Sequence, residues 1–201
     1  MTLAVGLLVL VAWLGPWSAG SGLQDLLDPS DTPADFIHCQ GYGCAQRFRV
    51  TLVEKDWLAL TRPLRSAADS PAAERRAVAE VVAAFERKVG ALTGSTQDRP
   101  RARFFETRSG QLDCVDETVN TATLLHLLQK AGLLRFHRPG APARRGYLVD
   151  GRWPHNTAVL VEQASGRAFA VDSWFGANGQ VPHIVPLEQW LAGWEPPQGT
   201  P

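Results

Sequence analysis

The feature that most restricts the fold is a helical pattern that begins at Asp113. Asp113 is a residue type that caps helices, and Asp116 and Glu117 place negative charge in the first turn. Gly132 supplies a C-terminal stop. The apolar positions lie on one broad face: Val115, Val119, Ala122, Leu124, Leu125, Leu127 and Leu128. Because so broad an apolar face needs cover from other elements, we predict that this helix lies at the centre of the core.

A second amphipathic helix is expected earlier in the chain. The segment Asp69–Pro71 places a capping residue before a proline at the first helical position. Gly90 and Gly94 are suited to end the helix. The apolar stripe comprises Val78, Val81, Val82, Phe85 and Val89. Charged side chains opposite this stripe favour a helix that packs one face on the core.

Strand patterns dominate the C-terminal third of the chain. His155–Val161 and Arg167–Val171 are apolar runs separated by Ser165-Gly166, a hairpin signal. Tyr147–Val149 is also strand-like, whereas the segment Phe136–Gly146, rich in Pro, Arg and Gly, is expected to be a loop. Helices followed by antiparallel strands predict an α+β fold, in which the helices pack against an antiparallel sheet.

Two shorter elements complete this expectation. Arg47–Val53 alternates in polarity and predicts a half-buried strand with Phe48, Val50 and Leu52 on the buried face. Leu187–Leu191 predicts a short terminal helix.

Composition excludes several broad classes of protein. The 201 residues are 45% hydrophobic and 20% charged, with a formal net charge of zero, which is typical of a globular domain and not of a disordered tail. No global positive field and no phosphate-binding glycine loop is evident, so we expect no nucleic-acid partner.

The N-terminus differs in kind from the rest. Leu3–Leu14 is an unbroken apolar run, and small residues at Ser18 and Gly20 suit cleavage after Gly20. We predict a signal peptide over residues 1–20, a periplasmic or secreted protein, and no stable membrane anchor after cleavage. The alternative is a buried N-terminal helix. The remaining chain is divided into a lead-in segment, a single domain and a tail: residues 21–46, 47–195 and 196–201.

The three cysteines divide into a pair and a single thiol. Cys39 and Cys44 flank a glycine-rich turn and are close enough for a local disulfide in an oxidising compartment. The alternative is a metal site that also uses His38, although three neighbouring ligands are fewer than a structural zinc site needs. Cys114 remains, and an odd thiol in an exported protein either pairs between chains or stays free for chemistry.

Cys114 has the surroundings of a nucleophile. It lies in the first turn of a predicted helix, where backbone N–H groups and the positive helix end favour a thiolate and can hold an oxyanion. A loop over residues 163–166 places Thr157 opposite Asp172, so that His155 lies diagonally across from Asp172 on the same face of the sheet. We therefore predict that His155 is the base for Cys114 and that Asp172 orients it.

The three motifs resemble those of the transglutaminase-like superfamily of cysteine peptidases. They are Asp113–Glu117, with its cysteine opening a helix, Pro154–Val159, with its histidine opening a strand, and Ala170–Trp174, with its aspartate ending the next strand. The similarity covers roughly Val78–Trp174. It implies a papain-like core and a catalytic triad of Cys114, His155 and Asp172. Members of this family often use an aromatic or amide side chain in the oxyanion hole, and Gln111 is a candidate by proximity.

Two functions remain open at this level. The first is an exported thiol hydrolase or acyltransferase that acts on peptide or isopeptide amides through a thioester, with a peptide or protein substrate and no cofactor or metal. Trp153 and Trp174 share a face with His155 and Asp172, which suits cleft walls and core packing equally. A zinc site built from the triad residues and His183 is a minor alternative. The second function is a non-enzymatic binding module on the same fold, with an unreactive Cys114.

Overall fold

The computed structural model describes residues 21–66, 69–103, 109–146, 151 and 153–197. The predicted signal peptide over residues 1–20, the predicted strand Tyr147–Val149 and the last part of the predicted tail lie outside the described residues.

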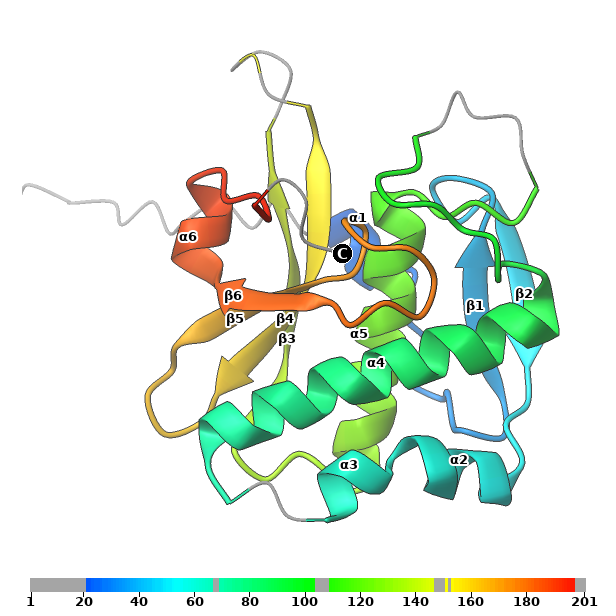
Figure 1. Cartoon of the computed structure of the whole chain (residues 1–201), viewed down its shortest axis with the longest axis horizontal. Coiled ribbons are helices and arrows are strands. Elements are labelled where there is room, and N and C mark those ends of the chain that lie inside the picture. The colour runs from blue at the N-terminus through cyan, green and yellow to red at the C-terminus, as the bar shows by residue number, and fades with distance from the viewer. Residues whose placement is uncertain (1–20, 67–68, 104–108, 147–150, 152, 198–201) are drawn as a thin grey trace, which may run out of the picture.

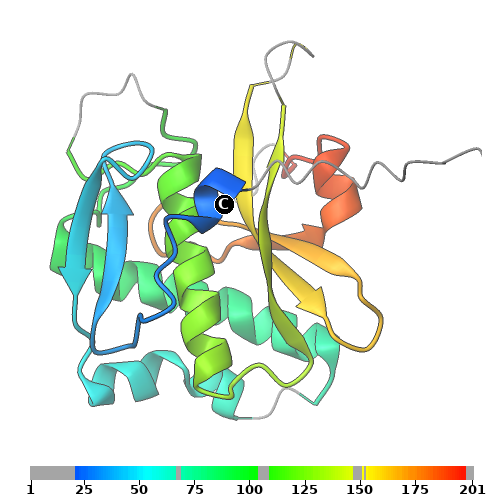
Figure 2. The same cartoon turned by 180° about the vertical axis from the view of Figure 1, so that it is seen from behind.

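A long helix, α5 (Cys114–Lys130), runs through the middle of the molecule between two antiparallel sheets (Figures 1 and 2). One sheet pairs β1 (Phe36–Gln40) with β2 (Gln46–Val50). The other has four strands in the order β3-β4-β5-β6: His137–Arg145, His155–Glu162, Ala168–Asp172 and His183–Pro186. The predicted α+β class, with helices packed against an antiparallel sheet, is confirmed.

The other helices surround this centre. The longest, α4 (Pro71–Thr93), crosses α5 at a steep angle in Figure 1. The described residues also form four short helices: α1 (Ser21–Gln24), α2 (Glu54–Leu60), α3 (Arg62–Arg65) and α6 (Leu187–Leu191). The short helix α6 was predicted, whereas α2 and α3 were not. No described helix is both long enough and apolar enough to cross a membrane.

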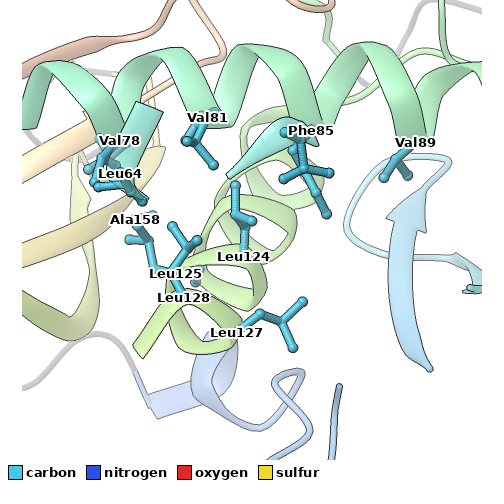
Figure 3. Packing of buried hydrophobic residues seen from close by; sticks show 14 of the residues in the cluster. Leu64, Val78, Val81, Phe85, Val89, Leu124, Leu125, Leu127, Leu128 and Ala158 are labelled. Atoms are coloured by element: carbon cyan, nitrogen blue, oxygen red, sulfur yellow. The ribbon is translucent and has the colours of Figure 1, made fainter. Parts of the chain in front are cut away.

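The two long helices begin and end at the predicted residues. The Ser70 side chain accepts a hydrogen bond from the Ala73 N–H and caps α4, which ends at Gly94 in a left-handed conformation. Figure 3 shows the predicted apolar stripe of α4 facing leucines of α5, with Ala158 of β4 beside them. Val78, Val81, Leu124 and Leu125 are all fully buried there. This contact forms the centre of the core and fixes the position of α5.

The hairpin between β4 and β5 has the predicted register. Ala158 pairs with Val171, and Glu162 and Arg167 close the loop over residues 163–166 with a 2.8 Å backbone hydrogen bond. Continued by one residue, this ladder sets Thr157 opposite Asp172, as predicted. Because side chains alternate between the two faces of a strand, this register decides which face His155 shares with Asp172.

The predicted loop Phe136–Gly146 is wrong in most of its length, because His137–Arg145 forms the edge strand β3. Two prolines in this strand lack N–H donors, which an edge strand tolerates, and a bulge interrupts the pairing between Gly140 and Ala143. A Cβ at Gly140 would lie 2.8 Å from the Val159 side chain, so glycine is needed for the close pairing. Proline and glycine mark an edge strand here and not a loop.

A buried carboxylate from α4 anchors the start of β3. Glu74 accepts hydrogen bonds from the N–H groups of Arg135, Phe136 and His137 and from the His137 ring. Neither Glu74 nor His137 has exposed side-chain surface. This contact spans 63 residues of sequence, so no local pattern could have indicated it.

The predicted lead-in segment contributes to the fold. Phe36 of β1 is buried in the main core and β1 pairs with β2, so regular structure begins before the expected domain start. Val50 and Leu52 are buried as predicted, but Phe48 is 37% exposed because only the end of β2 lies against the core. The Cys39–Cys44 disulfide is present. It indicates an environment outside the reducing cytoplasm.

Candidate active site

Cys114 is the first residue of α5, directly after the cap residue Asp113. The Asp113 side chain accepts hydrogen bonds from the N–H groups of Val115 and Asp116, and the Glu117 N–H bonds to the Asp113 carbonyl. These three first-turn donors are therefore occupied within the protein. No hydrogen bond from the Cys114 N–H is found among the described residues, so it is the first-turn donor that a ligand can use.

His155 and Asp172 form a buried pair. His155 Nε2 lies 2.7 Å from Asp172 Oδ2, and both side chains are almost fully buried. The indole N–H of Trp190, from α6, donates to the same carboxylate oxygen at 2.6 Å. Since an ionised carboxylate only accepts hydrogen bonds, Nε2 carries a proton in this pair. His155 Nδ1 is buried and, within the described part of the chain, has no hydrogen-bond partner.

Aromatic side chains surround the imidazole. The ring centroid of Trp174 lies 4.5 Å from that of His155, and Phe175 and Trp190 both lie at 5.3 Å. The Trp174 indole is fixed by a 2.9 Å hydrogen bond to the Ala102 carbonyl. These rings help to bury the His155–Asp172 pair, and burial strengthens the electrostatic interaction between the two side chains.

Cys114 contacts the residue that follows His155. The Asn156 side-chain amide donates to Cys114 Sγ at 3.6 Å, and the Asn156 backbone N–H also hydrogen-bonds the sulfur. No hydrogen bond joins Cys114 to His155, although both lie in the described part of the chain. The structure thus brings the sulfur to the start of β4 and leaves His155 Nδ1 without a partner.

The expected thiolate at the helix end is not supported. The pKa of Cys114 is raised to about 11, chiefly by burial and to a smaller extent by the negative charges of Asp113 and Asp172, while the Asn156 hydrogen bonds oppose the shift. The negative charge of the cap residue Asp113 offsets the positive charge of the helix end. Cys114, which is half-buried, is therefore a neutral thiol at neutral pH in this structure.

The disulfide-linked hairpin supports the start of α5. Asp116 accepts hydrogen bonds from the N–H groups of Tyr42 and Cys44, at 2.9 and 2.7 Å. One turn later, the Asn120 side chain bonds both the N–H and the carbonyl of Cys39. These contacts hold the turn that carries Cys114 against β1 and its loop.

Buried carboxyl groups lie behind the proposed triad. Glu117 accepts a 2.7 Å hydrogen bond from Ser173, the residue after Asp172, and so links α5 to the end of β5. Burial raises the pKa of Glu117 well above its usual value, and the charges of Glu86 and Asp98 raise it further. Burial also raises the pKa of Glu86 to about 8.

The other predicted site residues have different outcomes. Trp153 and Trp174 line a cavity of about 360 Å³ beside His155. Trp174 is nearly buried and Trp153 is 43% exposed, so one wall also packs in the core and the other faces solvent. The amide of buried Gln111 bonds backbone groups of Gln97 and Arg99, a loop contact that gives its predicted oxyanion role no support.

Two residues of the site were not singled out from the sequence. Asn156 directly follows His155 in the sequence, so its position next to a predicted triad residue could have indicated it as part of the site. Trp190 reaches Asp172 from a helix that begins 15 residues later in the chain. Only the packing of α6 on the sheet reveals that contact.

The described residues contain no metal-binding cluster at either of the two metal sites considered from the sequence. The described residues include no group of three or more His, Cys, Asp or Glu side chains arranged to hold a metal ion. Cys39 and Cys44 are bonded to each other, and Asp172 is engaged by His155 and Trp190.

No model of a known protein family, no curated protein and no solved structure matches this chain.

Proposed function

We propose that this protein is a thiol hydrolase or acyltransferase that acts on peptide or isopeptide amides, with Cys114 as nucleophile. The observation that carries the proposal is the state of His155: Asp172 holds Nε2 at 2.7 Å, while the buried Nδ1 has no partner among the residues that the structure describes. A neutral imidazole in this tautomer can accept a proton only at Nδ1. The short motifs that resemble those of transglutaminase-like cysteine peptidases support the same reading.

The chemistry proceeds from a neutral thiol. As Cys114 Sγ attacks the amide carbonyl, its proton moves to His155 Nδ1, and Asp172 stabilises the imidazolium. The imidazolium then donates this proton to the leaving amine, which leaves a thioester on Cys114. Water gives hydrolysis of the thioester and a second amine gives transamidation. Because the pKa of Cys114 is raised, deprotonation accompanies attack and does not precede substrate binding.

Two donors are suited to the oxyanion. The Cys114 N–H has no acceptor among the described residues, and the Asn156 side-chain amide already lies beside the sulfur at 3.6 Å. An oxyanion that forms next to Sγ falls within reach of both groups. We assign this role to Asn156 in place of Gln111.

One observation favours the second candidate, a binding module with a structural Cys114. The raised pKa, about 11, is that of an unreactive thiol. The two candidates therefore differ in whether His155 activates this sulfur.

Acyl transfer from p-nitrophenyl acetate tests this without knowledge of the substrate. For the enzyme we expect one acetyl group on Cys114 at neutral pH, seen by intact mass and peptide mapping. The rate should fall in His155→Ala by about a hundredfold or more, because general-base assistance is lost.

His126→Ala is the matched control, because His126 lies exposed on the same helix as Cys114 and outside the site. It should acetylate at the wild-type rate. Equal acetylation of wild type and His155→Ala would remove the catalytic role and favour the binding module.

A further inference from the structure

The cavity beside His155 is rich in arginine. Its lining includes Arg101, Arg103 and Arg145 together with Trp153 and Trp174. Because His155 also lines it, a group bound there lies next to the proposed triad. The three arginines come from two separate parts of the chain, the segment before α5 and the end of β3.

Positive charge exceeds negative charge among the described residues of this lining. Its one acidic residue among the described ones is Glu195, which already pairs with Arg101 at 3.1 Å. Arg103 is exposed and, within the described part of the chain, has no carboxylate partner; its guanidinium lies 5.4 Å from the Trp153 ring centroid. Such a group can take up a carboxylate through two parallel hydrogen bonds.

Hydrogen bonds and a ring contact within the protein hold the floor of the cavity in place. Arg145 donates hydrogen bonds to the backbone carbonyls of Trp190 and Trp194 and lies over the Trp190 ring, with 4.4 Å from its guanidinium carbon to the ring centroid. Trp190 in turn donates to Asp172. The positive wall is therefore tied to the same side chains that hold the proposed triad.

Size and chemistry together restrict the occupant. A volume of about 360 Å³ lies at the lower end of the range for small-ligand pockets and suits one or two amino-acid side chains. Indole rings cover the aliphatic part of a side chain, while guanidinium groups bind its carboxylate. We propose that this cavity selects peptides with an acidic side chain close to the scissile amide, an inference that rests on the proposed function.

Binding to the Cys114→Ala variant tests the selectivity without any reaction. The probes are the blocked tripeptides acetyl-Ala-Glu-Ala-amide and acetyl-Ala-Gln-Ala-amide, which differ in charge at one position. Titration followed by tryptophan fluorescence should show about tenfold tighter binding of the glutamate peptide at low salt, with the difference reduced at high salt.

Two variants place the effect on the cavity. In Arg103→Gln, combined with Cys114→Ala, we expect the preference for the glutamate peptide to fall to about twofold or less. Arg62→Gln, an exposed arginine on α3 outside the cavity lining, should keep it. Equal binding of both peptides, no binding of either, or a preference that survives Arg103→Gln would overturn the proposal. Because these variants carry no nucleophile, selective binding by a protein that fails the acetylation test would refute only the enzymatic function.

Discussion

At the scale of single residues, the surroundings of His155 decide what the site can do. One ring nitrogen is held by Asp172, and the other is buried with no partner in the described ranges of the chain, so the pair fixes the tautomer that can receive a proton. Trp190 donates to the same oxygen of Asp172 and orients the carboxylate. The chemistry thus depends on a hydrogen-bond chain from Trp190 through Asp172 to His155.

Asp172→Asn should lower acetylation of Cys114 strongly while the fold remains intact. The asparagine amide can donate to Nε2, which moves the imidazole proton to Nδ1 and blocks proton transfer from the thiol. The equivalent change in a serine triad costs about ten-thousandfold. The measurement is the rate of Cys114 acetylation, with circular dichroism to verify folding.

Asp69→Asn, an exposed aspartate before α4, is the control and should react like wild type. Trp190→Phe should reduce the rate less than Asp172→Asn, because it removes a donor to the carboxylate and leaves the His155 contact. A fully active Asp172→Asn protein would exclude Asp172 from the mechanism.

Sequence periodicity predicted which face of the sheet His155 and Asp172 occupy, but it gave no information on the pKa of Cys114. The faces of His155 and Asp172 follow from a four-residue loop and the two-residue period of a strand, so their register was predictable. The raised pKa of Cys114 was not, because it depends on burial by segments distant in the chain and on Asp113. The positive end of the helix favours a thiolate, but the charge of its cap residue Asp113 opposes this effect.

At the scale of elements, the β1–β2 hairpin and α5 act as one unit. The loop between Cys39 and Cys44 presents N–H groups to Asp116, and the strand itself bonds Asn120. The disulfide holds that loop closed over five residues of sequence separation. A change in the conformation of this loop therefore affects the position of the first turn of α5, which carries Cys114.

Replacing both Cys39 and Cys44 with serine should lower the free energy of unfolding by about 2 kcal/mol, the loop-entropy value for so short a closed segment. Urea denaturation measures this change. The acetylation rate of Cys114 should fall as well, because Asp116 loses firmly placed donors.

Cys114→Ser is the comparison for stability, since it removes a half-buried thiol and leaves the disulfide intact. It should unfold close to the wild-type urea midpoint. An unchanged unfolding free energy in the double serine variant would show that the hairpin holds α5 without the bond.

Elements were predictable where local signals agreed with packing. The caps at Ser70 and Asp113 set the two long helices, and both begin as expected. The edge strand β3 was missed because its prolines and glycine resemble a loop, while its pairing partner and the Glu74 anchor lie far away in sequence. Long-range contacts of this kind leave no local pattern.

At the scale of the whole molecule, the buried carboxyl groups make folding dependent on pH. Burial raises the pKa of Glu86 to about 8, from an ordinary value near 4.5 in the unfolded chain. Between these two values the folded state keeps a proton that the unfolded state has lost. The contribution of Glu86 to stability should therefore decrease as the pH rises through this interval, and level off above it.

Glu74 has the opposite sign and acts in a different interval. Burial raises the pKa of Glu74, but hydrogen bonds from His137 and from backbone N–H groups outweigh it, so the net shift is downward. Its contribution to stability is present above about pH 4.5 and is lost as the pH falls further. Glu86 therefore reduces stability as the pH rises, and Glu74 reduces it as the pH falls. The two effects occur in different pH intervals and can be measured separately.

Glu86→Gln should flatten the dependence of stability on pH between about 4.5 and about 8. One ionising group contributes a slope of about 1.4 kcal/mol per pH unit, and glutamine removes that group while its carbonyl can still accept from the Gly179 N–H. The measurement is the free energy of urea unfolding at several pH values across this interval.

Glu80→Gln is the matched control, because Glu80 is exposed on the same helix, and its curve should follow the wild type. The remaining slope in Glu86→Gln includes Asp116 and Glu117, because burial raises the pKa of both groups. Parallel curves for Glu86→Gln and wild type would show that Glu86 is ionised in the folded protein, and that this layer behind Cys114 is charged and not proton-bound.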